Sequence, residues 1–212
     1  MINRSFIILT LLVVAILRVY AADYPVSSIP KPLLKYASAV IRLKEHEVEI
    51  HSINKVTIKE HYVITILNAA GDIHANWSEQ YSQLNSVDRI DGALYDAAGN
   101  KLRTLKKSEI RDESVSSFMT MVDDNRVKYH NFYHRDYPYT VEYYSARTES
   151  QTMFLPNWSP VPARGISVEK SSFSLVSDKE YQYRVKTYNY ASASIQSPER
   201  NKKIEKWEVS QV

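Results

Sequence analysis

Hydrophobic and polar residues alternate with a period of two along most of the chain from Ala39 onward. The clearest run is KVTIKEHYVITIL, in which Glu60 alone interrupts one apolar face. Further runs of this kind, separated by turn residues, continue to the C-terminus. Seven or more such strands predict an all-β protein with the architecture of an antiparallel β-sandwich. The face predicted for KVTIKEHYVITIL consists of Val56, Ile58, Tyr62, Ile64 and Ile66.

The other runs indicate where the remaining strands and turns lie. Gly99, in the sequence DAAGNK, can take a positive φ and predicts a β-hairpin, and Gly71-Asp72 predicts another turn. The charges after the hairpin are typical of solvated scaffold, with Ser108 predicted to cap a brief helical turn. The expected strands after the first two lie at residues 73–82, 86–96, 100–105, 126–134, 138–148, 165–177, 179–189 and 203–210.

Two segments depart from the strand pattern. In SSIPKPLLKYASAV, Ser27 or Ser28 is predicted to cap one short N-terminal helix whose apolar face contains Leu33, Leu34 and Tyr36. FLPNWSPVPARG, residues 154–165, holds three of the eight prolines and therefore excludes a central strand. We expect Trp158 in this loop to pack as a plug, with ligand stacking as the alternative.

The first 22 residues have the features of an export signal. Arg4 precedes an apolar run from Phe6 to Leu17, and small residues follow at the positions that a signal peptidase tests. The run is shorter than the roughly 20 residues that span a bilayer. The sequence thus predicts a signal peptide at 1–22, a β-sandwich domain at 23–212, no membrane span after cleavage, and a periplasmic or secreted location.

Charge and cysteine content exclude several functions. Removing residues 1–22 takes away Arg4 and Arg18 and no acid, so the net charge falls from +3 to +1 (3 − 2). The remaining Lys and Arg alternate with acids instead of forming the basic stripe that nucleic-acid binding requires. The chain has no Cys, so it has neither disulfides nor a thiol nucleophile.

No catalytic or metal-binding set emerges from the motifs. His130 and His134 have the spacing of zinc ligands on a helix, but in the strand-like RVKYHNFYH they would lie about 13 Å apart. VDDNRVK, with Asp123 and Asp124, lacks the spacing of a calcium loop. The pair His134 and Asp136 has no serine elbow nearby. We therefore predict no enzyme, no cofactor and no metal.

The chain carries a family resemblance from about Tyr36 to the C-terminus. The resemblance rests on the order of five segments: YASAVIRLKEHEVEI, VTIKEHYVITILNAAGD, IDGALYDAAGNKLRTLKKSEIRD, DDNRVKYHNF and YPYTVEYY. It resembles the domain of unknown function found N-terminal to transglutaminase-like domains in exported proteins of Gram-negative bacteria. The resemblance implies a β-supersandwich, similar to the N-terminal domain of certain zinc aminopeptidases, before a papain-like core that would use Cys, His and Asp.

Two functions follow as hypotheses. The first is a non-catalytic exported module that docks onto, or presents substrate to, a transglutaminase- or protease-like domain that this chain lacks, or another exported protein. The second is a free-standing periplasmic module that binds glycans or peptides, with Tyr133, Tyr137 and Trp158 as candidate ligand contacts. Because KWEVSQV ends within a strand, we also expect a domain truncated at its C-terminus, with Trp207 and Val209 uncovered.

The signal peptide yields a direct prediction. Mass spectrometry of the exported protein should give a mature chain that begins at Ala22 or Asp23. An intact N-terminus recovered in a membrane fraction would contradict it.

Overall fold

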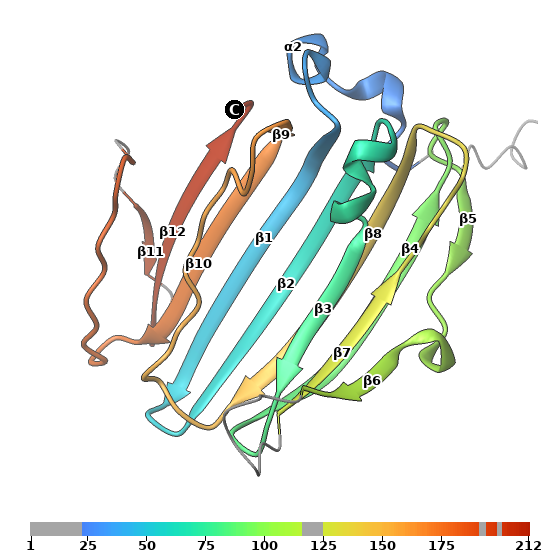
Figure 1. Ribbon diagram of the computed structural model, residues 1–212. Helices are drawn as coiled ribbons and strands as arrows, with labels where there is room; N and C mark the ends of the chain where they lie inside the picture. Colours follow the sequence, from blue (N-terminus) through green and yellow to red (C-terminus); the bar gives the residue numbers. More distant parts are fainter. Residues whose placement is uncertain (1–22, 116–124, 191–193, 199–200) are drawn as a thin grey trace, which may run out of the picture.

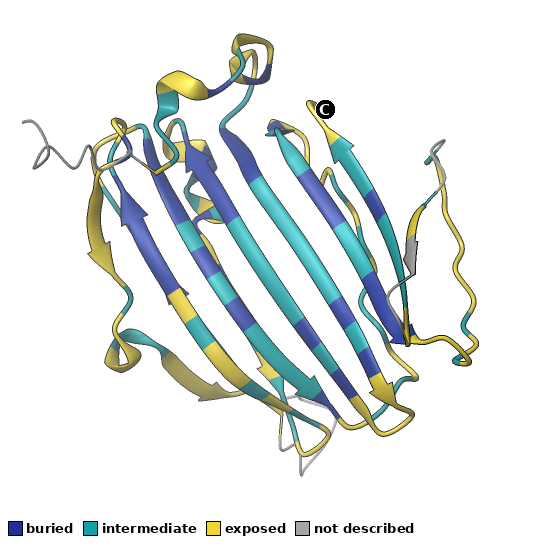
Figure 2. Ribbon diagram, turned by 180° about the vertical axis from the view of Figure 1, so that it is seen from behind, coloured by how far each residue is buried: buried dark blue, intermediate teal, exposed yellow. Residues whose placement is uncertain are grey.

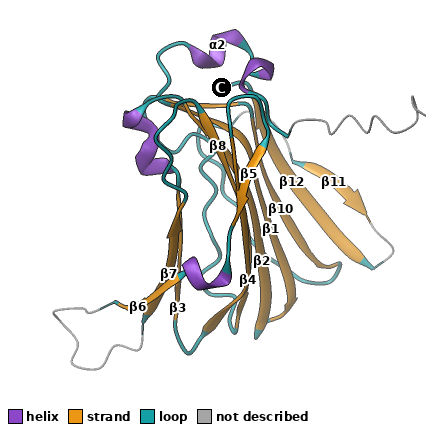
Figure 3. Ribbon diagram, turned by 90° about the vertical axis from the view of Figure 1, so that its right-hand side faces the viewer, coloured by secondary structure: helices purple, strands orange, loops and turns teal. Residues whose placement is uncertain are grey.

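The protein folds into two β-sheets that pack face to face, as the sequence predicts. A computed structural model describes residues 23–115, 125–190, 194–198 and 201–212. The large sheet has the strand order β11-β12-β10-β1-β2-β8-β4-β5, with β9 beside β1, and the small sheet has the order β3-β7-β6. In side view the small sheet forms one layer and the long strands of the large sheet form the other (Figure 3).

The strands of the large sheet are β1 (Ala39–Ser52), β2 (Lys55–Ile66), β4 (Asn85–Tyr95), β5 (Lys101–Thr104), β8 (Tyr139–Glu149), β9 (Ile166–Val168), β10 (Lys170–Asp178), β11 (Ile195–Pro198) and β12 (Lys202–Ser210). Those of the small sheet are β3 (Asn76–Tyr81), β6 (Arg111–Ser114) and β7 (Arg126–Asn131). The short helical segments are η1 (Val26–Ser28), α2 (Lys31–Leu34), η2 (Ala69–His74) and η3 (Lys107–Glu109).

The proline-rich loop allows two strands to pair in parallel with β1. Most neighbouring strands are antiparallel, but β1 pairs in parallel with both β9 and β10, which the sequence analysis did not foresee. Parallel pairing requires a crossover connection. Residues 150–165 supply it, because they return from the end of β8 along the sheet to the start of β1 (Figure 1). The predicted absence of strand from 154–165 is confirmed.

The large sheet has two faces that differ in character. We call the face toward the small sheet and the proline-rich loop the inner face, and the opposite one the outer face. All five apolar residues predicted to share a face of β2 lie in or against inner-face hydrophobic clusters, so that prediction is confirmed. One cluster, around Ile64 and Phe132, is covered by the small sheet, and the other contains Val48 and Trp207. Figure 2 views the outer face, where much of the mid-sheet is only partly buried.

The C-terminal third corrects two predictions. Residues 179–189, expected to form a strand, are turn and coil, and Tyr181, Tyr183 and Tyr190 pack over the inner face instead. Trp207 is therefore covered, at 6% exposure, rather than uncovered as expected. The hydroxyl of Tyr190 accepts a hydrogen bond from Glu208 N (3.1 Å) and donates one to Glu208 O (3.0 Å). Tyr181 and Tyr183 alternate as strand residues do, but Tyr183 and Tyr190 contact β12 through their side chains.

The N-terminal prediction is only partly correct. Helix α2 follows Pro30 and no side chain caps it; Ser28 instead ends the separate η1 turn and donates to Pro25 O (2.8 Å). Leu33 is buried as expected, whereas Leu34 and Tyr36 are exposed because the helix is too short to turn them inward. Residues 1–22, the predicted signal peptide, lie outside the described residues. In the described part of the chain, no helix has the length and apolar character to cross a membrane.

Both predicted glycine turns are present. Gly99 has φ 86° in the hairpin between β4 and β5, where Asn100 N donates to Asp96 Oδ1 (2.8 Å). Gly71 lies in η2 so close to the backbone that a Cβ there would meet Ser38 O at 2.4 Å. The turn at 107–109 also forms, but it is held by Glu109, which accepts from Lys106 N (3.0 Å), and not by the predicted Ser108 cap.

The burial of Trp207 can be tested by mutation. Trp207→Ala should lower the free energy of unfolding by about 3–5 kcal/mol, because it leaves a cavity in the cluster. Leu102→Ala, on the exposed face of β5, is the control and should change it by less than about 0.5 kcal/mol. Urea unfolding followed by circular dichroism measures both. Equal effects would mean that Trp207 is not part of a packed core.

Candidate functional site

A band of charged side chains crosses the inner face between the two hydrophobic clusters. The strand registers place His46 of β1 opposite Glu60 of β2, and Lys44 opposite Tyr62. On β8, Arg147 lies opposite Ile58 of β2. We call Lys44, His46, Glu60 and Arg147 the charged band. Because these positions alternate with outward-facing residues on the same strands, the band shares its face with the apolar core.

The charged band lines a cavity of about 370 Å³ between the two sheets. The small sheet contributes one wall, including Trp77, Ser78 and Glu79, and the proline-rich loop contributes Pro156 and Pro162. The walls thus combine aromatic and proline surface with charges of both signs. The other lining residues are Ile41, Tyr62, His74 and Asn76.

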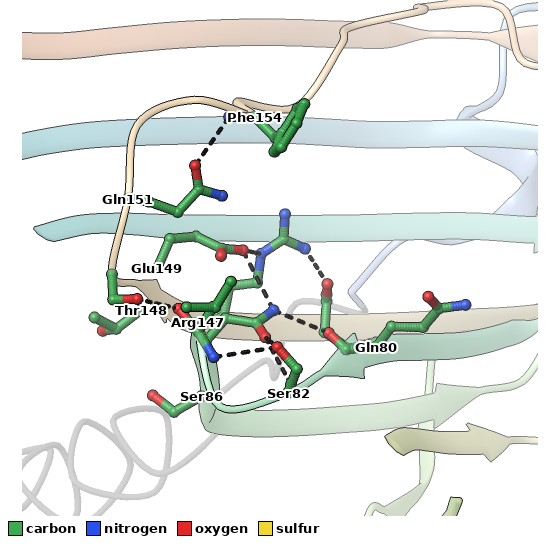
Figure 4. Close-up of polar contacts among 12 residues, drawn as sticks. Gln80, Ser82, Ser86, Arg147, Thr148, Glu149, Gln151 and Phe154 are labelled. Carbon is green, nitrogen blue, oxygen red and sulfur yellow. Dashed lines mark hydrogen bonds and ion pairs between the residues drawn. The ribbon is translucent and has the colours of Figure 1, made fainter. Parts of the chain in front are cut away.

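Arg147 is the centre of an ion-pair network that joins the two sheets. Its guanidinium pairs with Glu79 of β3 and, through Nε, with Glu149 Oε1 at 3.0 Å. Asn85 extends the network, because its Nδ2 donates to Gln80 O (3.2 Å) and to Glu149 Oε1 (3.4 Å). Figure 4 shows Arg147 and Glu149 on β8 facing Gln80 and Ser82. All three members of the ion-pair group are largely buried, so each depends on the others for compensation.

Burial and pairing act in opposite directions on the cavity's carboxylates. Burial raises the pKa of Glu79, and the positive charge of Arg147 opposes this shift only in part. Burial also acts to raise the pKa of Glu60, but the hydrogen bond and charge of His46 outweigh it and lower that pKa. The His46 Nε2 to Glu60 Oε2 distance is 2.5 Å. His46 Nδ1 is buried and has no hydrogen-bond partner among the residues that the structure describes.

The chain matches a known family over most of its length. A family model described as a domain of unknown function with solved structure, DUF3857, matches residues 53–212. The chain belongs to the DUF3857 family. The order of the strand motifs predicts a domain of unknown function, and this part of the resemblance is confirmed.

A solved structure shares the fold of this DUF3857 domain, and a second one gives a weaker match. A putative protease from Parabacteroides distasonis has a TM-score of 0.71 at 6% identity, over 82% of this chain and 36% of that chain. An M1 zinc metallopeptidase from Deinococcus radiodurans has a TM-score of 0.36 at 7% identity, over 82% of this chain and 39% of that chain. The chain thus spans less than two fifths of either structure's length. No curated protein matched the chain.

The candidate ligand contacts from the sequence do not line the cavity of the DUF3857 domain. Tyr133 is 61% exposed. Tyr137 donates to Asp72 Oδ2 at 2.5 Å, which raises the pKa of Tyr137 to about 12. Trp158 packs against the cluster that contains Trp207, and its Nε1 donates to Ser171 Oγ at 3.0 Å. The structure therefore does not bring Tyr133, Tyr137 and Trp158 together in one site.

The histidines considered for metal binding have separate surroundings. His130 is buried on β7, and its Nδ1 lies 2.8 Å from Tyr143 Oη. His134 lies beyond the end of β7, with Nε2 3.9 Å from Asp136 Oδ2. Asp123 and Asp124 fall outside the described residues. Within the ranges that the structure describes, no three His, Asp or Glu side chains are grouped to hold a metal ion.

Sequence reasoning missed the residues that line the cavity. Lys44, His46, Glu79 and Arg147 come from β1, β3 and β8, and nothing in their local sequence links them. Glu60 did give a signal, because it breaks an otherwise apolar face. A carboxylate in such a position requires a partner, and searching for that partner would have led to His46.

The network around Arg147 predicts a large effect on stability. Arg147→Met should lower the free energy of unfolding by about 3–5 kcal/mol, because it leaves Glu79 and Glu149 without their buried cation. Adding Glu79→Gln to this variant should restore part of the loss. The control is Arg89→Met, whose exposed pair with Asp91 should contribute less than about 1 kcal/mol. Equal losses for Arg147→Met and Arg89→Met in urea unfolding would contradict the assignment.

Proposed function

We propose that this DUF3857 domain is a non-catalytic module of an exported protein and that its inter-sheet cavity binds a polypeptide segment. In this role it docks onto a transglutaminase- or protease-like domain that lies outside this chain, or presents substrate to that domain. The observation that carries the proposal is the cavity itself. His46 and Arg147 are paired with acids of the cavity, while Lys44 and the aromatic and proline walls remain available to a ligand.

The surroundings of His46 support binding over catalysis. A general base must reach the proton that it removes, directly or through one water. Nε2 of His46 is already paired with Glu60, and Nδ1 is buried with no partner in the described ranges of the chain. In the described part of the chain, neither nitrogen contacts a hydroxyl that could serve as a nucleophile. The acids and bases of the cavity hold each other rather than activate a third group.

The chemistry of the walls favours a peptide. A peptide carries amide donors and acceptors, side chains of either charge and apolar groups, and the cavity offers a counterpart to each. Lys44 lies with Nζ 6.0 Å from the centre of the Tyr62 ring, so a cation and an aromatic surface face the same space. Trp77 adds apolar surface from the small sheet.

The proposed context comes from similarity. The sequence resembles domains that precede transglutaminase-like domains, and the fold recurs as 36% of a chain described as a putative protease. A module of this size in a larger protein is expected to serve the remaining part. The N-terminal signal pattern supports a location in the periplasm or outside the cell for that protein.

A free-standing glycan-binding module is the second candidate. The observation in its favour is the exposed Tyr133, which lies in the same short loop as Tyr137 and offers a ring on which a sugar could stack. Its site lies away from the cavity, so ligand mapping separates the two functions.

An NMR titration of the mature chain tests both functions. We expect a mixture of random hexapeptides to shift the amide signals of residues that line the cavity, and a mixture of oligosaccharides to leave them unchanged. Lys44→Ala should weaken peptide binding by about 5-fold or more, since a charged hydrogen-bond partner contributes about 1.5–3 kcal/mol. The control is Lys101→Ala, on exposed β5. Equal binding by both variants, or oligosaccharide shifts confined to Tyr133 and Tyr137, would overturn the peptide assignment.

A further inference from the structure

The outer face of the large sheet contains a second depression, of about 380 Å³, which lies on the opposite side of the sheet from the inter-sheet cavity. The registers place Glu45 of β1 between His61 of β2 and Ser172 of β10. Ser174 follows two positions along β10 on the same face and also lines the depression. Small serine side chains beside longer neighbours leave the hollow open to solvent.

Most charged groups around the depression are already paired. Lys59 Nζ lies 2.8 Å from Glu47 Oε1, and Lys206 Nζ lies 2.8 Å from Glu208 Oε2. His61 is held by Glu142 of β8, as described below. The cationic side chains of Lys59, Lys206 and His61 are therefore already paired with other acids.

Glu45 has no such partner. Within the described ranges of the chain it makes no hydrogen bond or ion pair, although it is half-buried and lines the depression. A carboxylate that has lost part of its hydration favours a cation at this point. The uncompensated charge of the depression is therefore negative, and it is centred on Glu45.

Ser172 provides a second and independent indication of a ligand. Its residue exposure is 2%, it lines the depression, and within the described residues its hydroxyl has no hydrogen-bond partner. The small exposed part of this residue therefore faces the depression, where its hydroxyl can accept a hydrogen bond from a ligand. It can accept from the same donor group as the neighbouring carboxylate, although a neutral hydroxyl forms the weaker hydrogen bond.

We propose that this depression binds the primary ammonium group of a lysine side chain or a related alkylamine, with Glu45 and Ser172 as its direct contacts. An ammonium group carries three donors and no acceptor. One N–H bonds the carboxylate of Glu45, another bonds the hydroxyl of Ser172, and the third remains hydrated. The alkyl stem lies toward Tyr144, whose ring already accepts the guanidinium of Arg89 at 4.9 Å from its centre.

His61 gives this site a pH dependence with a defined sign. Its Nε2 lies 2.8 Å from Glu142 Oε1, its ring is 6.4 Å from that of Tyr144, and Glu45 is its register neighbour. The hydrogen bond to Glu142 raises the pKa of His61, with a smaller contribution from the charge of Glu45. Below that pKa the imidazolium competes for Glu45. Amine affinity should therefore rise as the pH increases through the raised pKa of His61, while a lysine ammonium, of pKa near 10.4, stays charged.

The test is an NMR titration of the mature protein with Nα-acetyl-lysine methylamide. The uncharged Nα-acetyl-norleucine methylamide, which has the same stem, is the matched ligand control. We expect saturable shifts at Glu45 and Ser172 with the lysine compound only. Glu45→Gln should weaken binding about 10-fold, and Ser172→Ala about 3-fold, in line with one charged and one neutral hydrogen bond.

Two protein controls make the outcome decisive. Asp91→Asn removes an outer-face carboxylate that is taken by Arg89, and it should leave amine binding unchanged. Lys44→Ala, in the inter-sheet cavity, should also leave it unchanged, so that failure of this site and failure of the proposed peptide site are distinguishable. The proposal is overturned if the norleucine compound shifts the same signals, or if folded Glu45→Gln and Ser172→Ala both bind the amine as the wild type does.

Discussion

The pairing of Arg147 with Glu79 determines how the two sheets can lie on each other. Apolar contact is non-directional, and the cluster around Phe132 would tolerate a range of sheet positions. The buried guanidinium of Arg147 does not tolerate such a range, because a buried cation is stable only where carboxylates can pair with it. Glu79 on β3 and Glu149 on β8 meet this requirement together. The small sheet is therefore positioned by charge at one end and by packing at the other.

This constraint explains why the inner face is divided. The charged band separates the cluster under the small sheet from the cluster that contains Trp207. Each cluster has its own cover: the small sheet over one, and the aromatic segment around Tyr181, Tyr183 and Tyr190 with Trp158 over the other. The cavity lies where neither cover closes the face. The candidate site and a stability constraint thus arise from the same few side chains.

The sequence predicts those parts of the fold that depend on local alternation and turns. The apolar face of β2, the hairpin at Gly99 and the break at 154–165 all follow from near neighbours in the chain. Residues 179–189 alternate in the same way, yet they form no strand, because local pattern does not reveal that their tyrosines cover a cluster. Parallel pairing of β1 with β10 and the ion pair of Arg147 with Glu79 depend on contacts between distant segments, which no local signal encodes.

The hydroxyl of Tyr190 has a consequence for assembly. It forms hydrogen bonds with both the N–H and the C=O of Glu208. These two backbone groups lie on an edge of β12 and would otherwise be available to pair with another chain. Exposed strand edges of this kind are the usual starting points of strand addition and aggregation. By ending the hydrogen-bond ladder with a side chain, the protein keeps a long sheet from growing at that position. Copies of the protein that meet there encounter a tyrosine ring and not a template for another strand.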